Sequence, residues 1–266
     1  MEPVAGARTF AVSGDAYDRF MGRYSRSLAP EFATFAGVVT GMRVLDVGCG
    51  PGALTGELVR RLGASNVAAC DPSEPFVAAC AARHPGVEVR RGPAEQLPYD
   101  DREFDLVAAQ LVLHFISDPG RAGAECARVV RPGGVVTACV WDFDDGMEML
   151  RAFWDAALAG DPDAPDEARL LRFGRPGEVP QWLTDAGLVQ VAETTLTVET
   201  EYQDFDELWT SLLAGIGPAG SYCVGLPDAA RADLREALFE RLDSPTGSFR
   251  LGAVARAGRG LTAAPD

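Results

Sequence analysis

The chain has 266 residues, of which 47% are apolar, and a formal net charge of −15 from 24 basic and 39 acidic side chains. This length and composition fit one α/β domain with a small lid, and the acidic balance argues against a nucleic-acid partner, whose phosphate backbone requires clustered positive charge. Six cysteines without a C-x-x-C pair indicate free thiols rather than disulfides or a metal site. No apolar run reaches membrane-spanning length and no secretory leader is visible, so we expect a cytoplasmic protein without membrane insertion.

The first predicted element is an amphipathic helix that begins near Asp15. Gly22 lies in its middle, where a glycine costs about 1 kcal/mol, which suggests a bend or a close contact. The pattern permits two interpretations, a solvated surface helix or a lid that closes over a ligand. The apolar residues that share one helical face are Tyr17, Phe20, Met21, Tyr24 and Leu28.

The next predicted unit is a strand, a glycine-rich turn and a helix. The strand over residues 44–47 carries Asp46, three glycines follow at positions 48, 50 and 52, and leucines recur at helical spacing up to Leu62. Glycine allows close backbone approach, and the helix N-terminus presents unpaired N–H groups and partial positive charge. This turn predicts a site for a nucleotide-like ligand, although its spacing differs from the G-x-G-x-x-G dinucleotide fingerprint.

A second short strand over residues 66–71 ends in Asp71, about twenty residues beyond the glycine turn. Doubly wound folds place a carboxylate there that accepts hydrogen bonds from ribose hydroxyls. The alternative is a cap for the following helix, a role that Ser73 could also take. The two roles are compatible.

Two further strands are predicted over residues 87–90 and 104–110. The first runs into the turn 92–98, which can be a plain surface loop. Ligands of open α/β sheets bind beyond the carboxyl ends of the strands. We therefore expect Gln110, at the end of the strand 104–110, and His114, which follows it, to lie near a ligand. His114 is either a general base or positioning group, or a packed, hydrogen-bonded histidine.

The remaining pattern is a helix capped by Asp118, a strand over 135–141, and a region rich in helices. Helices are expected over residues 147–158, 175–188, 204–213 and 228–242, and strands over 189–200 and 248–255. The glycine- and alanine-rich segment 258–266 is expected to be a flexible tail.

The run Asp46-Val47-Gly48-Cys49-Gly50-Pro51-Gly52 resembles motif I of the class I S-adenosylmethionine (SAM) dependent methyltransferases. Residues 131–134, Arg-Pro-Gly-Gly, are similar to the family's turn before its fifth strand. The run 17–26 resembles a pattern of a small-molecule subgroup, such as the ubiquinone and menaquinone biosynthesis methyltransferases. The resemblance covers roughly residues 41–255, with the motifs in family order.

This resemblance implies a doubly wound α/β fold with a seven-stranded, mostly parallel sheet whose last strand is antiparallel. It further implies an N-terminal helical lid over residues 1–40 and a methyltransferase domain over 41–257. Helical segments inserted at about 143–175 and 203–245, before the last strand, would cover the substrate.

The resemblance also implies the ligand, SAM, and the residues that contact it. In the family the acid at position 46 helps to hold the methionine amino group, and the turn at 94–95 flanks the adenine. His114 is the candidate catalytic residue, and no metal is expected. The expected cofactor-binding set is Tyr17, Arg23, Asp46, Gly48, Cys49, Gly50, Asp71, Pro72, Ala94, Glu95, Gln110 and Leu111.

The expected activity is transfer of the SAM methyl to oxygen, nitrogen or carbon of a small molecule by in-line displacement. An NAD(P)-dependent oxidoreductase is an alternative, because Asp71 would also suit an NAD ribose. A SAM-binding enzyme of the same fold that does not transfer methyl, and a non-catalytic SAM-binding partner, are also compatible with the motifs. The sequence pattern does not distinguish the three acceptor atoms.

Overall fold

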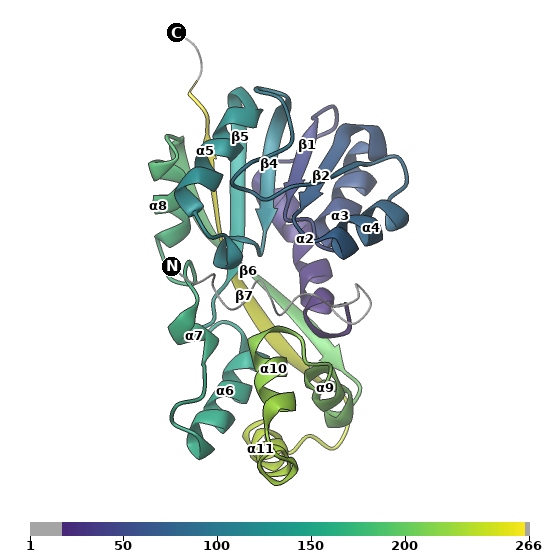
Figure 1. Cartoon of the computed structure of the whole chain (residues 1–266), viewed down its shortest axis with the longest axis vertical. Helices are drawn as coiled ribbons and strands as arrows, with labels where there is room; N and C mark the ends of the chain where they lie inside the picture. Colours follow the sequence, from purple (N-terminus) through teal and green to yellow (C-terminus); the bar gives the residue numbers. More distant parts are fainter. Residues whose placement is uncertain (1–17, 264–266) are drawn as a thin grey trace.

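A seven-stranded sheet of order β3-β2-β1-β4-β5-β7-β6 forms the centre of the computed structural model, which describes residues 18–263 (Figure 1). β1 pairs in parallel with β2 and β4, whereas β7 is antiparallel to both β5 and β6. The predicted mostly parallel sheet with an antiparallel last strand is thereby confirmed. The strands are β1 (Val44–Val47), β2 (Val67–Asp71), β3 (Glu88–Arg91), β4 (Phe104–Gln110), β5 (Val130–Trp141), β6 (Val189–Tyr202) and β7 (Phe249–Leu261).

Helices cover both faces of the sheet and produce two apolar cores. The inner strands β1 and β2 are buried along their whole length, as expected for parallel strands covered on both sides. One core joins alternate strand residues to α2 and α3, and the other joins the opposite residues to α5 and α8. The helices of these layers are α2 (Arg23–Ala36), α3 (Ala53–Leu62), α4 (Glu74–Arg83), α5 (Pro119–Val129) and α8 (Glu178–Asp185).

Beyond the carboxyl end of β5, β6 and β7 continue as a two-stranded ribbon that carries a helical cap (Figure 1). The last β5–β7 pair is Trp141 with Ala255, but β6–β7 pairing continues to Tyr202 with Phe249. The cap therefore lies at the edge where the parallel strands end. Its helices are α6 (Glu148–Gly160), α7 (Glu167–Leu170), α9 (Phe205–Leu212), α10 (Gly217–Gly225) and α11 (Asp228–Arg241).

Three short helical turns complete the described chain: η2 (Asp18–Gly22), η3 (Ala64–Asn66) and η4 (Leu113–Phe115). η2 is a π-helical turn directly before α2. Together they form the predicted amphipathic helix, which ends at Ala36, further along the chain than its apolar pattern indicated. Asp118 caps α5 as predicted, because its Oδ1 accepts from the Arg121 amide at 3.0 Å.

The expected flexible tail over 258–266 is corrected by the structure for its first residues. β7 reaches Leu261, and Gly258 and Gly260 pair with β5. A Cβ at Gly258 would lie 2.8 Å from Cγ1 of Val179 on α8. The small residues that suggested flexibility therefore allow a helix to pack directly on the strand.

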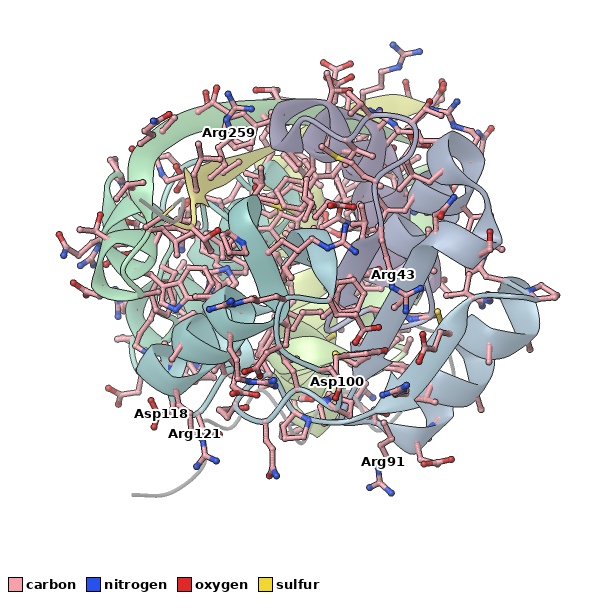
Figure 2. All side chains as sticks on the ribbon, turned by 90° about the horizontal axis from the view of Figure 1, so that it is seen from above. Arg43, Arg91, Asp100, Asp118, Arg121 and Arg259 are labelled. Carbon is pink, nitrogen blue, oxygen red and sulfur yellow. The ribbon has the colours of Figure 1, made fainter. Side chains whose placement is uncertain are left out.

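Charged side chains surround the apolar layers. Seen from above, Arg91, Asp118 and Arg121 point outward from the rim of the molecule (Figure 2). Arg43 instead joins neighbouring strands, because its guanidinium contacts Glu88 at 2.8 Å and Glu103 at 2.7 Å. Among residues 18–263, every helix is too short or too polar to cross a membrane.

Candidate functional site

The glycine turn between β1 and α3 is fastened to the end of β2. The amides of Gly48 and Cys49 donate to the Cys70 carbonyl at 2.8 and 3.0 Å. Gly48, Gly50 and Gly52 have φ angles of 70°, 52° and 99°, a region that residues with a Cβ rarely adopt. The turn therefore requires glycine at alternate positions, and its surface is made of backbone.

Two of these glycines face packed side chains and one faces open space. A Cβ at Gly48 would lie 2.0 Å from Cγ2 of Val112, and one at Gly52 would lie 2.6 Å from Nε2 of His84. That histidine donates to the Gly52 carbonyl across 3.0 Å and supports the turn. Around Gly50, in contrast, the described structure has no atom within 4 Å of an added Cβ. Gly50 is the part of the turn that a ligand can approach.

Asp46 lies below the turn and holds the start of α3. It is 1% exposed, and its Oδ2 accepts from the Thr55 hydroxyl at 2.6 Å. Burial raises the pKa of Asp46 to about 7, and the hydrogen bond from Thr55 opposes this rise. Thr55 is a partner that the sequence analysis did not identify.

Asp71 bridges the glycine turn and the loop after β2. Its Oδ2 accepts from the Gly50 amide at 3.0 Å, and its Oδ1 accepts from the Ser73 amide at 2.8 Å. Burial raises the pKa of this carboxyl, and the two backbone amides lower it. A carboxylate has about four acceptor positions, so the two amides leave capacity for two further donors. Capping and ligand binding are thus compatible for Asp71.

The predicted adenine-flanking residues follow β3. Ala94 is buried, whereas the Oε1 atom of Glu95 accepts from the amides of Ser117 and Asp118 at 3.0 and 3.2 Å. Glu95 therefore fixes the loop before α5. Pro72 is exposed, and its carbonyl accepts from Arg91.

The end of β4 turns sharply toward the glycine turn. Leu111 has a φ of 64°, unusual for a residue with a branched side chain, and its amide donates to the Cys139 carbonyl at 2.8 Å. The Gln110 Nε2 atom donates to the Ser25 carbonyl of α2 at 3.0 Å, while its Oε1 atom is buried and has no partner in the described part of the chain. Strained backbone and an unsatisfied buried acceptor both make this strand end a candidate ligand-binding position.

His114 follows on η4 and is 1% exposed. Its Nδ1 atom contacts the Arg172 carbonyl, which can only accept, so Nδ1 carries the proton. Burial lowers the pKa of His114 to about 4, and the imidazole is therefore neutral at physiological pH. Its Nε2 atom then holds a buried lone pair that has no hydrogen-bond partner among residues 18–263.

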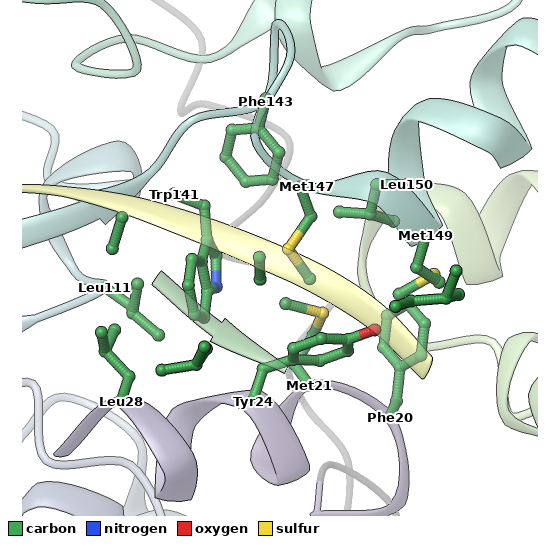
Figure 3. Packing of buried hydrophobic residues seen from close by; sticks show 14 of the residues in the cluster. Phe20, Met21, Tyr24, Leu28, Leu111, Trp141, Phe143, Met147, Met149 and Leu150 are labelled. Carbon is green, nitrogen blue, oxygen red and sulfur yellow. The ribbon is translucent and has the colours of Figure 1, made fainter. Parts of the chain in front are cut away.

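Trp141, the last residue of β5, is 2% exposed, and none of the residues that the structure describes accepts a hydrogen bond from its indole Nε1. Figure 3 shows this nitrogen facing apolar side chains, among them Tyr24, whose ring meets the indole edge-on at 6.2 Å between centroids. The ring of Phe143 lies 4.9 Å from that of His114 and connects the histidine to this group. We call the group the β5-edge cluster: Phe20, Met21, Tyr24, Trp141, Phe143 and Met147.

Arg23, predicted to contact a cofactor, instead fastens α2 to the ribbon and the cap. Its guanidinium pairs with Glu207 and lies 4.5 Å from the ring centroid of Tyr202. The neighbouring Tyr24 and Tyr202 hydroxyls are 3.3 Å apart. Tyr17, the second predicted contact from this segment, lies outside the described residues.

A separate groove of about 450 Å³ opens between α2, α3 and α4. Its lining includes Gly52 and His84 but neither Asp46 nor Asp71. The groove is therefore distinct from the strand-end site, where Asp46, Gly50, Asp71 and the chain after β4 converge.

The sheet order, the reversed last strand and the glycine turn flanked by carboxylates together define the class I methyltransferase fold. Residues 45–138, from β1 into β5, match the family model described as a methyltransferase domain. The match contains the glycine turn and the carboxyl ends of β1, β2 and β4.

The chain is also similar to named methyltransferases. It is 36% identical over 126 residues to phthiotriol/phenolphthiotriol dimycocerosates methyltransferase 1 of Mycobacterium ulcerans, and the aligned region covers 47% of this chain and 45% of that protein. The chain thus spans about half the length of the curated relatives that it matches.

Two solved structures share the fold at low identity. One is phosphoethanolamine N-methyltransferase 2 of Haemonchus contortus with phosphomonomethylethanolamine and S-adenosylhomocysteine (TM-score 0.56, 15% identity, 95% of this chain and 61% of that chain). The second is the [4+2]-cyclase SpnF (TM-score 0.53, 22% identity, 90% of this chain and 85% of that chain). The fold is therefore found in a methyltransferase and in a cyclase.

Proposed function

We propose that this protein is a SAM-dependent methyltransferase that acts on a small molecule. The observation that carries the proposal is the Asp71 carboxylate, held by the amides of Gly50 and Ser73 at the junction of the glycine turn and β2. The match of residues 45–138 to a methyltransferase domain supports the same activity.

The chain's own residues fit this cofactor. Asp71 retains acceptor capacity for a ribose diol, and the open space around Gly50 accommodates a ligand against bare backbone. Gln110 offers its unpartnered Oε1 to the cofactor's amino group, in a position fixed by the bond from its Nε2 to Ser25. Asp46 places a second carboxyl below the turn, and the positive charge of the same group would favour its ionised form.

SAM, when bound, supplies a methyl group on a positively charged sulfur. The protein's task is to hold an acceptor in line with that methyl and to exclude water, so positioning provides most of the acceleration. The helical cap and α2 close the carboxyl edge of the sheet for this purpose, with Arg23 and Glu207 joining the two. His114 can take a proton from the acceptor because its Nε2 lone pair is free.

The acceptor class follows from the charge and surface of the site. The β5-edge cluster is apolar, and the chain's net charge of −15 disfavours a nucleic-acid acceptor. The Mycobacterium relative is named for phthiotriol and phenolphthiotriol dimycocerosates. We therefore expect an apolar small molecule, whereas the similarity to the ubiquinone and menaquinone subgroup, like the cytoplasmic location, stays a prediction.

Calorimetric titration with SAM, S-adenosylhomocysteine and NAD tests the cofactor. We expect micromolar binding of the two adenosyl-sulfur ligands and no binding of NAD. Asp71→Ala should weaken SAM binding by roughly 1–3 kcal/mol, because the ribose hydroxyls lose a charged partner. Asp105→Ala is the matched control, since Asp105 accepts from the Arg43 amide at 2.7 Å near the start of β4, at the opposite edge of the sheet. Binding of NAD alone would indicate an oxidoreductase and refute the proposal.

A SAM-binding protein that does not methylate needs a separate test, since SpnF, a cyclase, shares the fold. Production of S-adenosylhomocysteine in the presence of an acceptor panel distinguishes the two. SAM binding without turnover on any acceptor of the panel would favour a protein that does not transfer methyl.

A further inference from the structure

Four buried side-chain nitrogen or oxygen atoms lack a hydrogen-bond partner within residues 18–263, and three of them lie at the carboxyl ends of β4 and β5. They are Oε1 of Gln110, Nε2 of His114 and Nε1 of Trp141. Leaving a buried polar group unpaired costs about 1–3 kcal/mol, so such groups are rare in native structures. Their concentration at the edge where ligands of this fold bind points to bound molecules as the missing partners.

Gln110 and Trp141 project from the same face of the sheet. Gln110 pairs with Cys139, and Trp141 is two residues further along β5, so both side chains point toward α2. The indole N–H is a donor only, and the β5-edge cluster around it has no acceptor oriented toward it. A ligand that satisfies this donor must carry an oxygen or another acceptor on an otherwise apolar body.

His114 provides the complementary group. The carbonyl of Arg172 fixes its tautomer, and Nε2 is left as an acceptor. Phe143 contacts the imidazole and belongs to the cluster that surrounds the indole. One apolar site thus contains a fixed donor and a fixed proton acceptor.

We propose that the β5-edge cluster binds an aromatic molecule with a phenol-type hydroxyl, and that this oxygen is the methyl acceptor. The inference rests on the proposed methyltransferase function and specifies its substrate. Trp141 Nε1 donates a hydrogen bond to an oxygen of the ligand, and His114 Nε2 accepts the proton of the reacting hydroxyl. Phe20, Phe143 and the thioethers of Met21 and Met147 provide the apolar cover, since sulfur packs well against aromatic rings.

The step balances without a further reactant. An oxygen lone pair forms the new O–CH₃ bond, the electrons of the breaking S–CH₃ bond stay on sulfur, and the hydroxyl proton passes to Nε2 of His114 and then to water. A neutral, buried imidazole is a weak base, so it suits a phenol better than an aliphatic alcohol, whose proton is far less acidic.

The charges near the β5-edge cluster favour oxygen over nitrogen as the methyl acceptor. Methylation of an aliphatic amine gives a product that is protonated at neutral pH, and a buried cation needs a counter-charge. The nearby carboxylates are already engaged: Asp142 pairs with Arg256 at 2.6 Å, and Glu148 accepts from the Gly252 amide. A methyl ether, in contrast, is neutral.

In this structure the cluster is packed closed, and η2 forms its outer wall through Phe20 and Met21. Single π-helical turns occur frequently at functional sites, and methionine side chains repack easily. The ligand enters when η2 moves aside and closes over it afterwards.

The test uses 1-naphthol and 1-naphthylmethylamine, which carry a phenol hydroxyl and an aliphatic amine on the same ring system, with SAM and the full chain. We expect the methyl ether of 1-naphthol by mass spectrometry and no methylated amine. Trp141→Phe keeps the ring and removes the donor, so KM for 1-naphthol should rise about 10-fold. His114→Asn should lower kcat about 100-fold or more. In both variants the SAM affinity should be unchanged, which shows that they fold.

Trp182→Phe is the matched control, because it removes an indole N–H that donates to the Pro119 carbonyl on the opposite face of the sheet. Its kinetics should equal those of the wild type. Methylation of the amine but not of the phenol, failure to methylate 1-naphthol while SAM binds, or wild-type kinetics in Trp141→Phe would each overturn the substrate assignment and leave the methyltransferase proposal standing. Absence of SAM binding would refute that proposal itself.

Discussion

Gly48 and Gly50 have the same unusual backbone conformation but different surroundings, and alanine substitutions should separate the two effects. Both residues have positive φ, at 70° and 52°, which costs a residue with a Cβ about 1–2 kcal/mol. At Gly48 the new methyl would also lie 2.0 Å from Cγ2 of Val112, and such overpacking adds about 1–3 kcal/mol. We therefore expect a loss of unfolding free energy of about 2–5 kcal/mol for Gly48→Ala and about 1–2 kcal/mol for Gly50→Ala.

For SAM affinity we expect the opposite order, with the larger loss in Gly50→Ala. The described structure leaves the space beside Gly50 open, so its methyl would intrude on a bound cofactor, and Gly50→Ala should lose SAM affinity out of proportion to its stability. Urea unfolding monitored by circular dichroism gives the stabilities, and calorimetry gives the affinities. In the Gly48→Ala background, Val112→Ala should restore part of the loss, with a coupling of about 1–2 kcal/mol. Equal urea midpoints for the two glycine variants, or no coupling to Val112, would refute the packing argument.

The buried carboxyl of Glu167 accepts from the Trp154 indole at 2.9 Å, and burial raises its pKa to about 7. Since the folded state then holds a proton that the unfolded state releases near pH 4.5, stability is full below that pH and is lost as the pH rises through 7. Urea unfolding gives the unfolding free energy at pH 5 and at pH 8. Its decrease between the two should be larger for the wild type than for Glu167→Gln by roughly 1–3 kcal/mol. The same decrease in both proteins would exclude the effect. Gly258→Ala should destabilise by about 1–3 kcal/mol because its Cβ meets Val179, whereas Gly247→Ala, with open space around it, should be neutral in the same assay.

The geometry around the glycine turn, where we propose that the cofactor binds, could be predicted from local patterns. Asp46, the three glycines and Asp71 each lie at the end of a short apolar run, and parallel strands bring their carboxyl ends together. The sequence could not show that Thr55 bonds to Asp46, because a threonine in the first turn of a helix has many equivalent uses.

Contacts between residues far apart in the sequence explain what the local patterns did not predict. The contact of Arg23 with a cofactor stays a prediction, and its ion pair with Glu207, 184 residues away, is one that no local pattern reports. The segment after 257 was expected to be loose because glycine and alanine dominate it. Its order comes from α8 packed on Gly258, which is visible only once strand and helix are assembled.

The β5-edge cluster, where we propose that the acceptor binds, depends on the same kind of assembly. Trp141 belongs to β5, His114 to η4 and Met21 to η2, and only the closing of α2 and the cap over the sheet edge buries them together. Aromatic residues at helical or strand spacing indicate a core in most proteins, so composition alone favours a purely structural role for the cluster. What distinguishes this cluster from a core is polar satisfaction: a core would leave neither an indole N–H nor an imidazole lone pair unpaired. Because that criterion applies to individual atoms, it becomes visible in the folded structure and not in the residue pattern.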